Sequence, residues 1–276
     1  MSRSTAVTVI EPGRAALHYW RDLWQYRELF MFLAWRDVVV RYKQTAIGVA
    51  WAVLRPAVAA LAFTIVFGKL AKLPSEGVPY ALLVAAAILP WQFFASSFSD
   101  ASNSLIDNSN LISKVYFPRI IIPASAVIVG VVDLLFSGAI LAVLMAWYRV
   151  IPDWRVLSLP LFVALAFGIA VGAGLWFASL NVKYRDFRYI VPFVVQFGLY
   201  VSPVGFSSAI VPEHWRLVYS LNPMVGVIDG FRWALLGGSQ ALFAPGLAIS
   251  CVVTSALLLS GIAFFRRTEK SFADII

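Results

Sequence analysis

The chain has 276 residues, of which 61% are hydrophobic and only 13% are charged, and its formal net charge is +8. Its mean hydropathy of +0.83 lies far above the range of soluble globular chains, which excludes a soluble enzyme and a soluble nucleic-acid-binding domain. Since one helical crossing takes about 20 apolar residues, the sequence predicts an all-α integral membrane protein with roughly six or seven crossings and no separate soluble domain.

Residues 1–46 form a predicted cytoplasmic N-terminal arm that contains an amphipathic helix. Arg21, Asp22 and Glu28 fall on one side of this helix, and apolar residues with two tryptophans occupy the opposite side. A helix of this composition typically lies in the interface between membrane and water. We therefore predict an interfacial helix, which either anchors the arm only or has a further role. The apolar residues of this helix that we expect to face the membrane are Leu17, Trp20, Leu23 and Trp24.

A six-span transmembrane domain is predicted over residues 47–266, and residues 267–276 form a cytoplasmic tail. The fifth apolar stretch is interrupted by Pro192 and Pro203, and the residues after it are apolar but too broken to cross. This pattern predicts short re-entrant or outer helices between the fifth and sixth spans. The predicted spans are 48–68, 80–99, 120–147, 157–180, 188–206 and 244–265.

The distribution of Lys and Arg predicts the orientation. The N-terminal arm, the loops 100–119 and 181–189, and the C-terminal end from Arg266 hold 7, 2, 3 and 3 basic residues, whereas the three connections on the opposite side hold 2 each. Because cytoplasmic loops carry the excess of basic residues, both termini are predicted to be cytoplasmic.

Two ionisable residues fall within predicted spans. Asp133 lies near the middle of the third span, and Arg55 lies early in the first. Such residues are rare in membranes and mark either internal pairing or function. For Asp133 three roles stay open: a hydrogen bond or ion pair inside the bundle, the lining of a polar conduit, and proton coupling. Arg55 is expected to extend toward the cytoplasmic face or to pair with an acidic group.

Motifs for catalysis are not evident in the sequence. His18 and His214 are predicted on opposite sides of the membrane, which does not suit a shared metal or acid–base site. No G-x-x-x-x-G-K-[ST] motif for nucleotide phosphates occurs anywhere in the sequence. We predict that the chain is not an enzyme, holds no metal or cofactor, and takes its energy from a partner or a gradient.

Several strings together carry a family resemblance. They are "LPWQFF", "NSNLISKVYFPRIIIP", "NVKYRDFRYIVPFVVQFGLYVSPV" and "LNPMVGVIDGFRWALLG". Their order and spacing, from about residue 17 to the C-terminus, resemble the ABC-2 type permeases that export cell-surface polysaccharides such as O-antigen, capsule or teichoic acid. Residues of these strings expected to have structural roles are Arg185, Asp186, Pro203, Asn222, Pro223 and Arg232.

The resemblance implies partners, substrate and location. Two permease copies would form a homodimer and join two copies of a separate ABC nucleotide-binding subunit, which would bind ATP and Mg. The substrate would be a lipid-linked polysaccharide, and the location would be the bacterial cytoplasmic (inner) membrane. The alternatives are an exporter of a small lipophilic compound or antibiotic with the same fold, and a membrane-embedded transferase of lipid-linked sugars.

The resemblance also implies site residues. The segment after the second span would dock on the ATPase, unless it only sits among lipid headgroups; its residues are Asn110, Leu111, Ile112, Lys114, Tyr116, Phe117, Pro118 and Arg119. Aromatic rings suit a sugar conduit because they contact the faces of sugar rings, although packing would also explain them. The conduit candidates are Trp91, Phe93, Phe94, Asp133, Phe197 and Tyr200. Arg185 and Asp186 are predicted to hold the fifth span in register through hydrogen bonds or an ion pair.

Overall fold

The computed structural model describes residues 15–43, 48–237 and 242–272, and within these ranges every regular element is a helix. Four helices of the described chain are long and apolar enough to cross a membrane. They are α4 (Tyr80–Asp107), α6 (Ile121–Trp147), α7 (Leu159–Lys183, preceded by the 3-10 turn Trp154–Ser158) and α11 (Ala244–Thr268). The all-α class and the second, third, fourth and sixth apolar stretches are therefore confirmed as long helices.

The first and fifth predicted spans form shorter elements. Helix α3 (Gly48–Phe63) continues into a π-helical segment, η1 (Thr64–Leu70), and α8 (Phe187–Val201) has 15 residues. Helix α8 ends where the Ser202 N–H donates to the Gly198 carbonyl at 2.8 Å, directly before Pro203. Since about 20 residues are needed for a straight crossing, the count of six spans stays a prediction.

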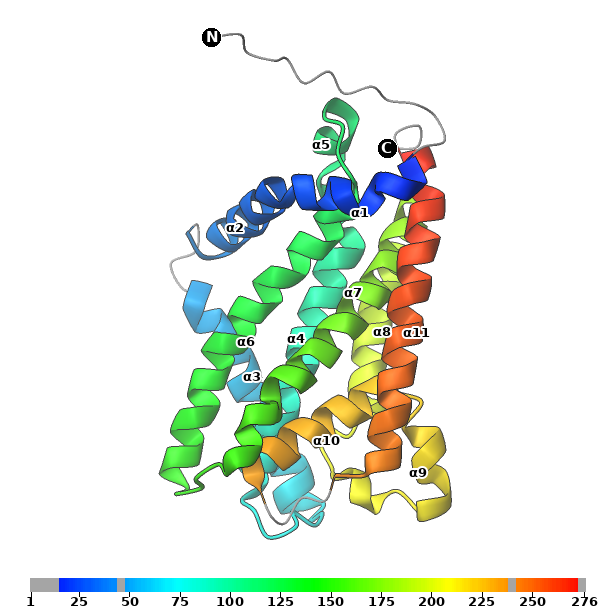
Figure 1. The fold of residues 1–276 in the computed structure, drawn as a ribbon. Coiled ribbons are helices and arrows are strands. Elements are labelled where there is room, and N and C mark those ends of the chain that lie inside the picture. Colours follow the sequence, from blue (N-terminus) through cyan, green and yellow to red (C-terminus); the bar gives the residue numbers. More distant parts are fainter. Residues whose placement is uncertain (1–14, 44–47, 238–241, 273–276) are drawn as a thin grey trace.

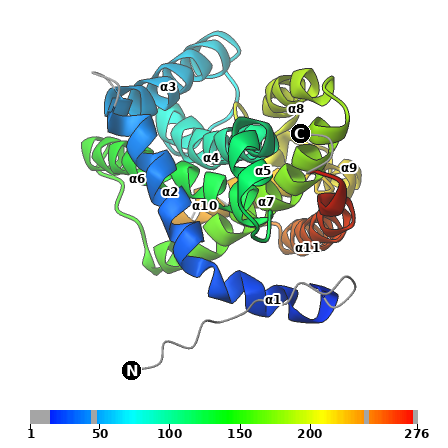
Figure 2. The ribbon, with the colours of Figure 1, turned by 90° about the horizontal axis from the view of Figure 1, so that it is seen from above.

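Helix α4 is the centre of the bundle. In its most apolar 18-residue stretch 78% of the residues are buried, against 17% to 33% in the other three long helices. Helices α6 and α7 pack on α4, and α11 packs on α7 (Figures 1 and 2). The α7–α11 contact depends on Gly172 and Gly261, because a Cβ on Gly261 would lie 2.5 Å from the Gly172 carbonyl oxygen.

The N-terminal arm lies across one end of the bundle, which is the cytoplasmic end in the predicted orientation (Figure 1). It consists of α1 (Ala15–Gln25) and α2 (Arg27–Lys43), and α2 packs against α6. Leu23 packs on a buried cluster, whereas Trp24 is 72% exposed. The side chains of Leu17 and Trp20 lie outside the described residues. An interfacial position of this arm stays a prediction.

Short helices occupy the opposite end, as expected for the segment after the fifth apolar stretch. They are the 3-10 turn η3 (Ser208–Ile210), α9 (Glu213–Tyr219) and α10 (Pro223–Leu236), at the bottom of Figure 1. Helix α5 (Ser109–Lys114) and the 3-10 turn η4 (Glu269–Ser271) lie at the cytoplasmic end instead.

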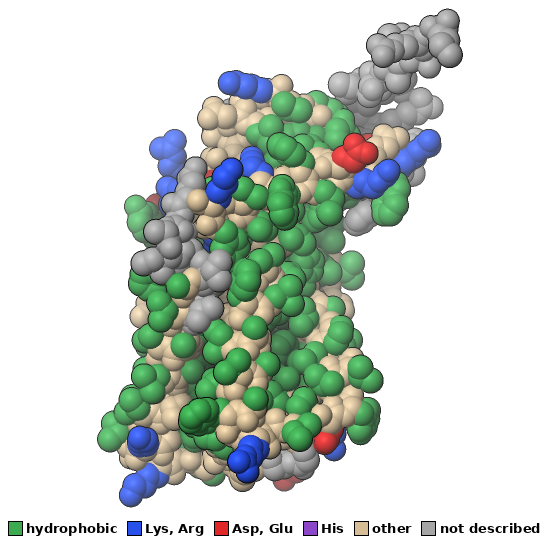
Figure 3. All heavy atoms as spheres, turned by 90° about the vertical axis from the view of Figure 1, so that its left-hand side faces the viewer, with side chains coloured by type: hydrophobic (Ala, Val, Ile, Leu, Met, Phe, Trp, Pro, Cys, Tyr) green, Lys and Arg blue, Asp and Glu red, His purple; other side chains and the backbone are tan. Residues whose placement is uncertain are grey.

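One face of the molecule has the polarity of a membrane protein. In Figure 3 hydrophobic side chains cover the middle of this face, and most Lys and Arg side chains gather near its two ends. This distribution suits an apolar slab between two aqueous phases, because charges at its edges reach the headgroups and water.

Candidate functional site

The segment 110–119 is divided by the structure into buried and exposed side chains. Ile112 and Phe117 are 4% and 5% exposed and pack in a cluster with residues of α2, α4, α6, α7 and α11. In contrast, Tyr116 is 67% exposed. The exposed residues of this segment are Asn110, Ser113, Lys114, Val115 and Tyr116, whereas Leu111, Pro118 and Arg119 are partly buried. Docking of a partner subunit on this segment stays a prediction.

Two hydrogen bonds hold this segment at the cytoplasmic end, and a third joins one of its partners to α1. The Arg119 guanidinium donates to the Glu269 carbonyl at 2.5 Å, which attaches the segment to the end of α11. The Tyr26 hydroxyl donates to the Tyr116 carbonyl at 3.4 Å. The Tyr19 hydroxyl donates to the Glu269 carboxylate at 3.3 Å, and burial raises the pKa of Tyr19, so the phenol stays protonated. A movement of this segment would therefore also move the helices to which these hydrogen bonds connect it, which are α1, α2 and α11.

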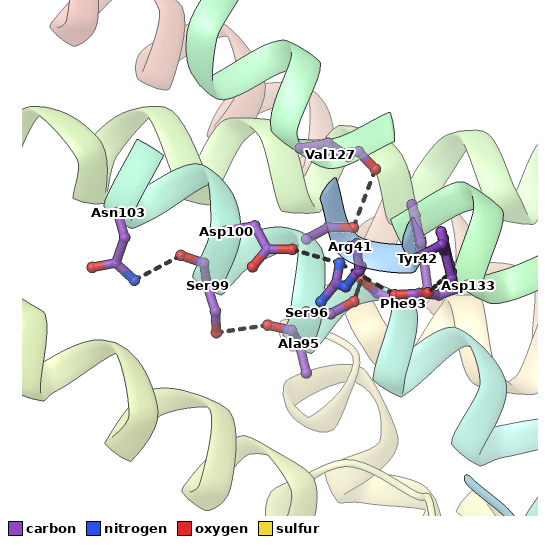
Figure 4. Close-up of polar contacts among 11 residues, drawn as sticks. Arg41, Tyr42, Phe93, Ala95, Ser96, Ser99, Asp100, Asn103, Val127 and Asp133 are labelled. Carbon is purple, nitrogen blue, oxygen red and sulfur yellow. Dashed lines mark hydrogen bonds and ion pairs between the residues drawn. The ribbon is translucent and has the colours of Figure 1, made fainter. Parts of the chain in front are cut away.

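A polar cluster joins α2 to α4 and α6 (Figure 4). The Arg41 guanidinium lies 3.0 Å from an Asp100 carboxylate oxygen and 3.3 Å from one of Asp133. The Tyr42 hydroxyl donates to the other Asp133 oxygen. Burial, followed by this hydrogen bond, raises the pKa of Tyr42, so the phenol remains a donor at neutral pH. Asp133 thus has the hydrogen bond and the ion pair that the first of its three predicted roles requires, and its other two roles stay predictions.

The aromatic conduit candidates fall into two groups. Trp91, Phe93 and Phe94 are at most 7% exposed and belong to the main core cluster, so within one subunit they pack rather than line a surface. Phe197 and Tyr200 are 58% and 63% exposed. A conduit role stays a prediction for all five aromatic residues, and among them only Phe197 and Tyr200 present their rings at the surface of a single subunit.

Helix α8 presents an aromatic face that sequence reasoning found only in part. Tyr189, Phe193, Phe197 and Tyr200 are all more than half exposed and recur every three or four residues. The rings of Phe193 and Phe197 are stacked at 5.8 Å between centroids. Behind them Trp91 packs on the backbone, because a Cβ on Gly198 would lie 2.7 Å from its ring. The sequence feature that predicts this face is the spacing of its four aromatic residues, three or four positions apart, as on one side of a helix.

The local hydrogen bonds predicted for Arg185 and Asp186 are formed by their backbone carbonyls and not by their side chains. Both side chains are exposed, and neither has a hydrogen bond or ion pair with any described residue. Their backbone carbonyls accept from the N–H groups of Arg188 and Tyr189, which forms the first turn of α8. The ion pair at this end of α8 joins Arg188 to Asp107 instead, at 3.9 Å. The turn is set by backbone bonds because the two side chains point away from the protein.

Arg232 organises the outer end. It is 1% exposed, and its guanidinium donates to the carbonyls of Leu83, Phe206 and Val204 at 3.1, 2.9 and 3.2 Å. Burial lowers the pKa of Arg232, and nearby carboxylates, first Asp229, oppose that shift. The three bonds fix the turn after α8, which contains Pro203, to α4 and α10.

The Asn222-Pro223 pair begins α10. The Asn222 side-chain oxygen accepts from the Met224 N–H at 3.1 Å, and its amide donates to the Ser202 hydroxyl at 2.9 Å. Pro223 occupies the first helical position, where no N–H is needed. Asn222 and Arg232 therefore have specific contacts that fit their expected structural roles, and Pro203 and Pro223 lie in the turn and the helix start that these contacts hold.

With this geometry established, the comparison with known proteins decides the family. Residues 28–236 match the family described as "ABC-2 type transporter". The chain belongs to the ABC-2 type transporter family.

Several curated proteins resemble the chain over almost its whole length. An O-antigen export system permease protein of Myxococcus xanthus is 27% identical over 93% of this chain and 98% of its own length. One of Klebsiella pneumoniae is 26% identical over 90% of this chain and 95% of its own length. A polysialic acid transport protein of Escherichia coli is 23% identical over 86% of this chain and 92% of its own length.

Proposed function

We propose that this ABC-2 family member is the membrane permease subunit of an exporter for a cell-surface polysaccharide carried on a lipid. The observation that carries the proposal is the similarity, along nearly the whole chain, to proteins named for O-antigen export and polysialic acid transport. The full-length alignment includes both ends of the bundle, so the likeness extends beyond a shared membrane core. The location that follows is the bacterial inner membrane, with both termini cytoplasmic.

The energy source in this proposal is a separate ABC nucleotide-binding subunit, which binds ATP and Mg. The sequence lacks a phosphate-binding loop of its own. The exposed part of the segment 110–119 supplies a contact for such a subunit, since Tyr116 and Val115 are 67% and 49% exposed at the cytoplasmic end. The buried Ile112 and Phe117 support that contact from behind.

The conduit in this proposal forms between two copies of the chain. Helices α3 and α8 lie on one side of α4 when the bundle is viewed along its length (Figure 2). Helix α3 exposes Leu54, Val58 and Leu61 at helical spacing, and α8 exposes its aromatic face. Pairing two such surfaces around a two-fold axis would cover apolar side chains and leave aromatic rings for the sugar.

A test of coupling uses Tyr116→Asp in the permease expressed with its ATPase. We expect normal membrane abundance and dimerisation, because an exposed side chain contributes little to folding. Recovery of the ATPase with the permease and movement of glycolipid into reconstituted vesicles should both fall at least about tenfold. The matched control is Tyr148→Asp, which changes an exposed tyrosine at the opposite end.

Three outcomes would contradict this proposal. Normal export by Tyr116→Asp would remove the segment as the coupling contact. ATP hydrolysis by the isolated permease would remove the partner as the energy source. Transport of a small lipophilic compound, with no movement of glycolipid, would contradict the proposed substrate and leave the proposed role as a transporter.

A further inference from the structure

A cavity of about 230 Å³ lies between α2, α3, α4 and α6, next to the cluster of Figure 4. Tyr42 and Asp133 line one part of it, and Trp51, Arg55 and Gln92 line another. An apolar cavity of about 150 Å³ holds a benzene molecule, so this cavity has room for a headgroup of similar size. Trp51 is 53% exposed and Arg55 is exposed, so the cavity opens to the surface of the subunit.

Of the charged residues around the cavity, Arg41 contacts both Asp100 and Asp133, and Arg55 stands apart from them. Asp133 is already engaged at both carboxylate oxygens, by Tyr42 and by Arg41. Arg41 has a second carboxylate partner in Asp100 at 3.0 Å. Among the residues that the structure describes, Arg55 has no hydrogen bond or ion pair. The expected pairing of Arg55 with an acidic side chain is therefore not found.

The position of Arg55 makes this lack of a partner costly. It lies about two helical turns, or about 10 Å, from the first residue of α3, inside an apolar stretch. A cation at this depth in a membrane is usually neutralised by a carboxylate, by carbonyls or by water. Since Asp133 and Asp100 already contact Tyr42 and Arg41, an anion bound from outside the chain would give Arg55 a partner of its own.

We propose that this cavity binds the phosphate group of a lipid, with Arg55 as its cationic ligand. A guanidinium fits phosphate oxygens with two parallel N–H donors, and the Gln92 amide offers further polar contact. Trp51 at the mouth suits the headgroup zone, where indole rings gather. The inference rests on the proposed function for the orientation of the chain, which places Arg55 in the cytoplasmic leaflet.

Two sources could supply this phosphate. One is a phospholipid of the surrounding bilayer, and the other is the phosphorylated carrier of the polysaccharide. The shared chemistry is a phosphate with an attached apolar chain. In the second case the cavity would hold the lipid end of the substrate beside the α3 surface while the glycan enters the conduit.

The test measures binding to the purified, delipidated permease dimer by native mass spectrometry, without the ATPase. The probes are polyprenyl phosphate, the same polyprenol without phosphate, and short-chain phosphatidylglycerol. We expect the phosphorylated probes to bind and the polyprenol to bind at least about tenfold more weakly. Arg55→Gln should lose this preference, and Arg55→Lys should retain part of it. Lys69→Gln is the control, because it removes an exposed cation near the far end of the same span.

Each outcome decides the proposal. Preference for polyprenyl phosphate assigns the carrier as the ligand, and equal binding of both phosphorylated probes assigns bilayer phospholipid. Binding that ignores the phosphate, or that Arg55→Gln leaves unchanged in a folded dimer, overturns the site. Export of the glycolipid is measured separately, so phosphate binding by a permease that exports another substrate would contradict the proposed function and leave the site intact.

Discussion

Two arginines at opposite ends of the bundle, Arg232 and Arg41, have different kinds of partner. At the outer end Arg232 is 1% exposed and donates to three backbone carbonyls. At the cytoplasmic end the Arg41 side chain is 33% exposed and pairs with the carboxylates of Asp100 and Asp133. Carbonyl contacts fix the path of a backbone, whereas contacts between side chains join separate helices.

This difference has consequences for movement. If the Arg232 contacts broke, three buried carbonyls would lose their donor and the cost would be high. If the Arg41 contacts broke, water could replace them, because both partners are partly exposed. These contacts favour a single arrangement at the outer end and allow a change of pairing at the cytoplasmic end, which suits the proposed action of a partner subunit on segment 110–119.

The largest effect is expected from Arg232→Met. The variant keeps much of the side-chain volume but removes all three hydrogen bonds inside the core, and it should cost about 3 to 5 kcal/mol of stability. Thermal unfolding of the detergent-solubilised permease measures this loss. Lys69→Met serves as the control because Lys69 is exposed near the same end. If Arg232→Met were as stable as Lys69→Met, the Arg232 contacts would not be the costly ones to break, and the difference from Arg41 would be contradicted.

A smaller effect is expected from Arg41→Gln, about 1 to 2 kcal/mol, because charge-assisted bonds are lost at a partly exposed position. Hydrogen exchange should rise in the C-terminal half of α2 and stay unchanged in α10. Tyr42→Phe should reproduce part of this increase, since it removes one hydrogen bond to Asp133. Equal increases at both ends would mean that the arm and the outer helices unfold as one unit.

The smallest effect is expected from Asp186→Asn. The side chain is exposed and has no partner among the described residues, so the change in stability should stay within about 0.5 kcal/mol. Complex formation with the ATPase and glycolipid export, measured on the same variant, sharpen the comparison. Lost complex formation at normal stability would make Asp186 part of the subunit contact, and a clear loss of stability would contradict the exposed position.

The sequence by itself determined the features that depend on composition and local pattern. The long apolar stretches gave α4, α6, α7 and α11, because hydropathy summed over about 20 residues is a strong signal. Asn222 and Pro223 were expected to have structural roles, and they begin α10 through capping chemistry that acts within three residues. The ordered motifs also indicated the ABC-2 family that the comparison confirmed.

Tertiary structure alone decided which side chains face inward and which charges meet. Trp91 and Phe197 look equally suitable for a conduit in the sequence, yet one is 5% and the other 58% exposed. Arg41 and Asp133 are far apart in the chain and join only because α2 packs against α6. In an apolar chain nearly every helical face is hydrophobic, so periodicity cannot separate a face that packs on protein from one that meets lipid or a partner.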